Sequence, residues 1–122
     1  MAEREEIPEP LNLYGAFEGR VGEFYWMVLE GGAVSHRPEN FLATFPELKS
    51  SCVILSDLSE LPKKRIWLGD SLESALSKIV TKHIGEAEVC LIYLPSGLYV
   101  FTQDQPLHQK MFRKVLDLLG LP

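Results

Sequence analysis

The 122-residue chain lacks long apolar runs, and none approaches the roughly 20 residues needed to span a bilayer. Its first residues, MAEREEIPEP, are acidic and contain no apolar segment of the kind that a secretory signal requires. They also lack the arginine-rich, acid-poor composition of a transit peptide. We therefore expect a cytoplasmic protein that does not associate with membranes.

Cysteine is scarce, and its placement excludes several classes of site. Cys52 and Cys90 are the two cysteines, and no CxxC motif is present. This excludes the usual cysteine-based metal signatures, and a reducing cytosol disfavours a disulfide between them. Each lies in an apolar, strand-like run, CVIL or VCLIYL. We expect both thiols to be buried and to pack as small hydrophobic side chains.

Catalytic and cofactor motifs are also missing. The chain has no GxxxxGK[ST] loop, no GxGxxG fingerprint and no GxSxG elbow. Its histidines are His36, His83 and His108, and no two are spaced i, i+4 as in a helical metal site. We expect His83 in the last turn of a helix and His108 on a solvent-exposed helix face. The sequence thus indicates no enzyme, no cofactor and no metal.

Positive charge is too sparse for nucleic-acid binding. The net charge is −5, whereas nucleic-acid-binding domains are usually basic. Residues 1–10 carry −3 of this net charge, because Glu3, Glu5, Glu6 and Glu9 stand there against Arg4 alone. We expect residues 1–12 to form a flexible acidic arm and residues 13–122 to form one domain. The arm is either simply solvated or docks on a basic partner, as in an immunity or chaperone-type protein.

Apolar patterning predicts strand, strand and helix, repeated three times. Residues 21–30 fit either a strand or a helix, but their aromatic and β-branched side chains favour a strand. Gly31-Gly32 is a typical two-residue hairpin turn, with a short strand over 33–36 after it. A helix over 38–49 follows, which Pro46 should break or kink.

The remaining pattern contains two further hairpins and two further helices. The predicted strands are 52–58, 65–68, 88–94 and 98–103, and the predicted helices are 70–84 and 106–119. Asp70 is the expected N-cap of the first of these helices, Gly85 its C-cap, and Asp104 or Gln105 the N-cap of the second. The sequence therefore predicts an α+β protein with a mixed, mostly antiparallel sheet of five or six strands and three helices on one face.

The strand 88–94 suggests how the protein assembles. Its residues VCLIYL are apolar at consecutive positions, which is typical of a strand covered on both faces. Helices on one face would leave the other face open, to be covered by the N-terminal segment or by a second copy of the chain. We therefore expect a homodimer, whose interface would include Leu91, Tyr93, Tyr99 and Phe101.

Two features could mark a ligand site. Asp57 follows an apolar strand, where α/β sheets often place ligands, and this strand alone resembles the phospho-acceptor strand of receiver domains. An aspartate that forms a turn is the more common case. Trp26 and Trp67, with Tyr25, could cover a small molecule, although burial in the core or in an interface is more usual for such residues.

The element order over residues 38–119 resembles that of roadblock/LC7-type domains: helix, hairpin, helix, hairpin, helix. The resemblance is one of architecture, covers about two-thirds of the chain, and involves no motif residues. Such domains usually dimerise and act as scaffolds or regulators for small GTPases. The leading hypothesis is therefore a non-enzymatic, homodimeric interaction or regulatory module. The alternatives are a small-molecule sensor and a protein that uses its acidic arm to bind a basic partner.

Overall fold

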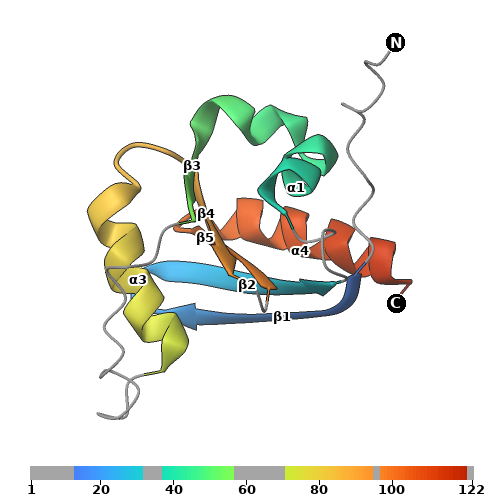
Figure 1. Cartoon of the computed structure of the whole chain (residues 1–122), viewed down its shortest axis with the longest axis horizontal. Coiled ribbons are helices and arrows are strands. Elements are labelled where there is room, and N and C mark those ends of the chain that lie inside the picture. Colours follow the sequence, from blue (N-terminus) through green and yellow to red (C-terminus); the bar gives the residue numbers. More distant parts are fainter. Residues whose placement is uncertain (1–12, 32–36, 57–70, 95–96, 121–122) are drawn as a thin grey trace.

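The computed structural model describes residues 13–31, 37–56, 71–94 and 97–120, except for the Tyr14 side chain. Figure 1 shows its helices and strands. In chain order they are β1 (Leu13–Val21), β2 (Phe24–Gly31), α1 (Pro38–Thr44), the 3-10 helix η2 (Pro46–Ser51), β3 (Cys52–Leu55), α3 (Leu72–His83), β4 (Val89–Leu94), β5 (Gly97–Thr102) and α4 (Gln105–Leu119).

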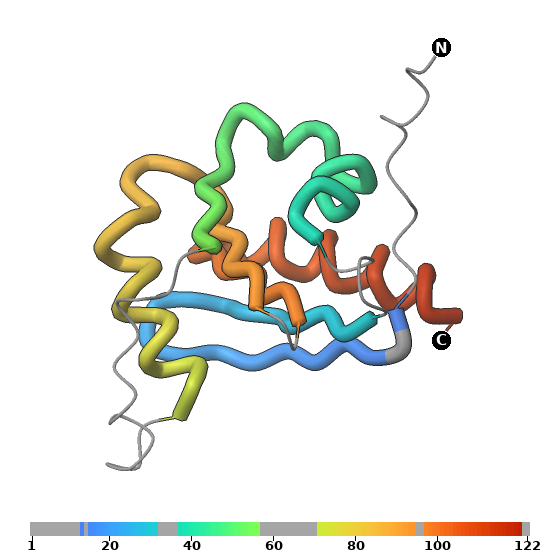
Figure 2. The backbone as a smooth tube through the Cα atoms, in the orientation of Figure 1, coloured from blue at the N-terminus to red at the C-terminus, as the bar shows by residue number. Residues whose placement is uncertain are grey.

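The strands form one sheet in the order β1-β2-β5-β4-β3. Neighbouring strands are antiparallel except β3 and β4, which are parallel. These strands confirm the predicted α+β class and the mixed, mostly antiparallel sheet. Figure 2 shows β1 and β2 as a long hairpin, with β1 at the outside of the sheet.

The first hairpin turns at a different place from the one predicted. Residues 24–31 are a strand, as the aromatic and β-branched side chains indicated, but its hairpin partner precedes it. Gly22 and Glu23 form the two-residue turn, and Gly22 has a φ of 58°. Glycine at the first central position is what a type II′ turn requires. The Gly31-Gly32 prediction was therefore wrong about the partner of β2.

The helix ends mostly follow the local sequence signals. α1 stops at Thr44, before Pro46, and the chain continues as η2. Asp104 caps α4 by accepting a hydrogen bond from the Leu107 N–H at 3.1 Å. The cap of α3 is Ser71 instead of Asp70, because the Ser71 hydroxyl accepts from the Ser74 N–H at 3.0 Å. Within the described residues, no helix is both long and apolar enough to cross a membrane.

Helices cover both faces of the sheet, which corrects the prediction of three helices on one face. On one face α1, η2 and α4 pack against alternate residues of the strands, among them Leu91 of β4. On the other face α3 packs through Leu76 and Val80 against Cys90 and Ile92 of the same strand. The connection from β3 through α3 to the parallel β4 is a crossover, and crossovers of this kind are almost always right-handed. The hand of that crossover determines which face α3 covers.

Several predicted features lie outside the described residues. They are the acidic arm over 1–12, the short strand over 33–36, the strand over 65–68, and the candidate ligand residues Asp57 and Trp67. The functions proposed for the arm and for these two residues stay predictions.

Candidate functional site

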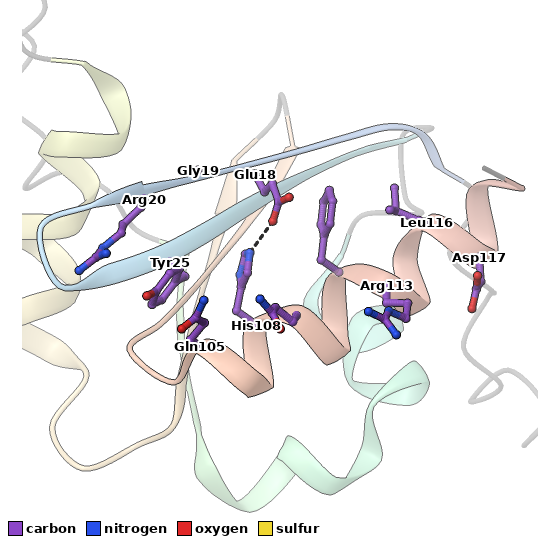
Figure 3. Close-up of a pocket in the computed structure, with 11 residues that line it drawn as sticks. Glu18, Gly19, Arg20, Tyr25, Gln105, His108, Arg113, Leu116 and Asp117 are labelled. Atoms are coloured by element: carbon purple, nitrogen blue, oxygen red, sulfur yellow. Dashed lines mark hydrogen bonds and ion pairs between the residues drawn. The ribbon is translucent and has the colours of Figure 1, made fainter. Parts of the chain in front are cut away.

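A groove of about 840 Å³ runs between the β1–β2 hairpin and α4. Figure 3 shows its side chains, which come from β1, β2 and α4. The residues that line it are Glu18, Gly19, Arg20, Tyr25, Gln105, His108, Gln109, Phe112, Arg113, Leu116 and Asp117. The groove thus lies beside β1, at the outer edge of the sheet.

His108 is the buried polar residue of this groove. Only 3% of it is exposed, and its Nε2 lies 2.7 Å from Oε1 of Glu18 on β1 (Figure 3). Its ring stacks on that of Phe112 and lies against Tyr25, with centroid distances of 6.1 and 5.6 Å. The prediction of a solvent-exposed His108 was wrong. Helix α4 packs across β1 as well as β2, so the side of the helix that carries His108 is covered.

The contact with Glu18 holds the His108 imidazole in one orientation. His108 Nδ1 is buried and has no hydrogen-bond partner, whereas Nε2 faces the Glu18 carboxylate. The residues that line the groove include no serine, threonine, cysteine or lysine. The described lining of the groove therefore holds no pairing of His108 with one of these nucleophilic side chains.

Charges of both signs surround the groove. The Arg20 guanidinium lies 5.1 Å from the centre of the Tyr25 ring, and its Nε donates a hydrogen bond to the Gly22 carbonyl at 3.3 Å. Arg113 and Asp117 add one charge of each sign along α4. Because these charges alternate, the groove does not present the concentrated positive field that a phosphate-rich ligand needs.

The outer strand β1 carries exposed apolar surface on the face of the sheet opposite the groove. Phe17 is 56% exposed, the largest value among the exposed large hydrophobic residues described. The Trp26 ring lies on Gly19, where an added Cβ would be 2.5 Å from Trp26 Cζ2. Val21 packs against the same cluster as Trp26, on the α3 side of the sheet. We call Phe17, Val21 and Trp26 the edge strip.

The predicted interface residues are largely covered by the chain's own helices. Leu91 and Phe101 are fully buried, whereas Tyr93 is half-buried. Tyr99 is 6% exposed, and its hydroxyl donates to Oε2 of Glu73 on α3 at 3.2 Å. Burial and the Glu73 carboxylate raise the pKa of Tyr99 to about 12. A partner docking on the closed fold would reach mainly Tyr93 among these four residues.

The proposed aromatic ligand site divides between the two faces of β2. Tyr25 contacts His108 on the α4 side, whereas Trp26 contacts Tyr99 on the α3 side, with a centroid distance of 5.9 Å. Consecutive strand residues point to opposite faces, so one small ligand cannot contact both rings. Among the described aromatic residues, those that share the groove are Tyr25 and Phe112.

The two cysteines also lie on opposite faces. Cys52 packs with the cluster under α1 and α4, and Cys90 is fully buried in the cluster under α3. Both thiols are free. Burial raises the pKa of Cys52 to about 11, and burial together with Cys52 raises that of Cys90 to about 12. The prediction of thiols that pack as hydrophobic side chains is confirmed for Cys90.

Sequence reasoning missed the groove, although one signal was available. His108, Met111, Phe112 and Val115 are spaced i, i+3, i+4 and i+7, which is the spacing of one helix face. This spacing places His108 on the apolar side of α4. Glu18 gave no comparable signal, because its contact depends on how the hairpin packs against α4.

The chain is an α+β protein with a mixed sheet that helices cover on both faces and a groove at one edge of the sheet. In the described residues, no group of three or more histidine, cysteine, aspartate or glutamate side chains could hold a metal ion. Comparison of the chain with family models, with curated proteins and with solved structures found no match. The resemblance to roadblock domains therefore remains one of element order.

Proposed function

We propose that this protein is a non-enzymatic interaction module that acts as a homodimer. The observation that carries the proposal is the edge strand β1, whose exposed Phe17 lies in a nine-residue strand with one paired neighbour among the described strands. An edge strand presents backbone N–H and C=O groups that can pair with another chain. An exposed aromatic side chain beside these groups adds apolar area that association would bury.

This support differs from the reason that the sequence suggested. The apolar second face of β4 is covered by α3, so it no longer requires a second copy. The position of β1 at the edge of the described sheet and the edge strip now carry the proposal. A cytoplasmic location belongs to the same proposal, because two free thiols on opposite sheet faces suit a reducing compartment.

Sedimentation velocity over a wide concentration range tests this function. We expect a dimer whose dissociation constant rises when Phe17 is replaced by serine. The matched control is Ile54→Ser, which changes an apolar side chain of similar exposure, 47%, on β3 at the opposite edge of the sheet. A strict monomer at high micromolar concentration would contradict the proposal, as would equal effects of the two substitutions.

A second candidate is a small-molecule sensor that uses the groove. It is favoured by Tyr25 and Phe112, which flank the buried His108, and by the polar side chains around them. Such a mixture of aromatic surface and few polar groups is common in ligand pockets. A thermal-shift screen of metabolites, confirmed by native mass spectrometry, would test it. Stabilisation by a metabolite that is lost in Gln105→Ala, with the fold intact, would support this function.

A further inference from the structure

We propose that the β1 strands of two copies pair antiparallel about a twofold axis at Gly19, so that Glu18 of each copy faces Arg20 of the other. This inference rests on the proposed homodimer and specifies its interface. It specifies which residues of the two β1 strands lie opposite one another, and it adds two charge pairs between the copies. Twofold dimers use the same patch on both copies, so the patch must complement itself.

β1 is the better of the two edges that the described sheet offers. It has nine residues, whereas β3 at the other edge has four. A longer strand offers more backbone groups for pairing and more side chains to bury. β1 also contributes Phe17 and Val21 to the edge strip, and Phe17 is 56% exposed.

The hairpin determines which backbone groups of β1 face outward. The turn of two residues places Val21 opposite Phe24, and residues that flank such a turn exchange backbone hydrogen bonds. Hydrogen-bonded and non-hydrogen-bonded pairs alternate along an antiparallel ladder. Gly19 therefore pairs with β2, whereas Glu18 and Arg20 direct their N–H and C=O groups to the open side.

Electrostatics then selects among the registers that this alternation allows. A twofold axis at Glu18 would oppose two carboxylates, and an axis at Arg20 would oppose two guanidinium groups. An axis at Phe17 would place Ala16 opposite Glu18, without a charge pair. An axis at Gly19 places Glu18 of each copy opposite Arg20 of the other. Both residues direct their backbone groups outward, and the two resulting pairs each join opposite charges.

The other face of the sheet fits the same register. Phe17 of one copy would lie opposite Val21 of the other, and both positions belong to the edge strip. The Trp26 ring already lies on Gly19, beside the proposed axis, so the two copies would bring these rings together. The interface would thus be apolar on the α3 side and charged on the α4 side.

Charge reversal tests the register. The R20E chain carries two negative charges at positions 18 and 20, and the E18R chain carries two positive charges there. We expect each variant alone to dimerise roughly tenfold or more weakly than wild type, because both charge pairs become repulsive. We expect an equimolar mixture of the two variants to recover a heterodimer of near wild-type affinity, because both pairs are attractive again.

Two controls keep the result interpretable. E18R also removes the Glu18–His108 contact, so its circular dichroism and thermal midpoint are measured, and R20E, which keeps that contact, provides the main comparison. As a second readout, R20K is treated with a zero-length carbodiimide, and mass spectrometry of the covalent dimer identifies the joined peptides. We expect a link between Glu18 of one copy and the amine at position 20 of the other.

The outcomes separate this inference from the proposed function. A wild-type dimer that R20E leaves unchanged, or cross-links that join other segments, would overturn the register while the homodimer stands. A monomeric wild type would overturn both the register and the homodimer. Recovery of the heterodimer together with the expected cross-link would establish the interface.

Discussion

The hydrogen-bond partners of individual side chains in this protein depend strongly on which strand or helix packs against them. Tyr99 illustrates this, because its hydroxyl reaches Glu73, which is far away in sequence, on α3. His108 does the same toward Glu18 on β1. A tyrosine on a strand and a histidine on a helix are both common. In each case the contact with a residue distant in the sequence determines what the side chain does.

Replacing Tyr99 by phenylalanine tests the first of these contacts. The fold raises the pKa of Tyr99 from an ordinary value near 10 to about 12, so it stabilises the neutral phenol. This contribution is complete below pH 10 and is lost as the pH rises through 12. We expect Tyr99→Phe to lower the free energy of unfolding by about 1 kcal/mol at pH 8.

Urea denaturation over a pH series measures both effects. The wild-type free energy of unfolding should decline between pH 10 and 12 more steeply than that of Tyr99→Phe. Tyr93→Phe, which changes a half-buried tyrosine on the neighbouring strand, serves as the control. Parallel pH profiles for wild type and Tyr99→Phe would contradict the assignment.

At the scale of elements, the β1–β2 hairpin is the part that depends most on glycine. Gly22 supplies the positive φ of the turn, and Gly19 leaves space for the Trp26 ring on the strand itself. The helices depend on conventional caps, Ser71 for α3 and Asp104 for α4. Local sequence signals therefore explain where most of these elements begin and end.

Gly19→Ala tests the seating of Trp26 on β1. The new Cβ would lie 2.5 Å from Trp26 Cζ2, so the ring must move, and we expect a loss of about 1–3 kcal/mol of stability. Gly15→Ala is the matched control on the same strand, because its nearest contact would be the flexible Glu30 carboxylate at 3.3 Å. Thermal unfolding and tryptophan emission report the result. Equal stability of the two variants would show that Trp26 does not rest on Gly19.

The whole molecule is organised as two packed layers of side chains, one on each face of a single sheet. The layer under α1, η2 and α4 and the layer under α3 are separated by the strands themselves. Adjacent strand residues therefore enter different layers, as Tyr25 and Trp26 do. The same alternation separates the two cysteines.

Thiol accessibility tests this arrangement. With pKa values of about 11 and 12, Cys52 and Cys90 carry at least roughly a hundredfold less thiolate than exposed cysteines. We expect a chromogenic thiol reagent at pH 8 to modify both slowly in the native protein, Cys52 first, and both rapidly in urea. An intrachain disulfide in the folded protein, seen by mass spectrometry without reductant, would contradict the assignment to opposite faces.

Much of the fold could be predicted from the sequence, whereas little of the site could. Strand β4 and helices α3 and α4 have clear periodicity, and Pro46 marks the end of α1. The hairpin partner of β2 was missed because Gly31-Gly32 is a stronger turn signal than Gly22-Glu23. The groove was missed because Glu18 and His108 come from opposite ends of the chain and meet only when α4 packs across β1.

The sequence by itself determined the α+β class, most element boundaries and the burial of the strand Val89–Leu94 on both faces. These properties depend on local periodicity, caps and apolar content, which are present in the sequence independently of how the elements pack together. The tertiary structure alone decided which helix covers which face of the sheet, and which polar side chains share a groove. These depend on strand order and on the hand of the β3–α3–β4 crossover, which bring together residues that no local pattern connects.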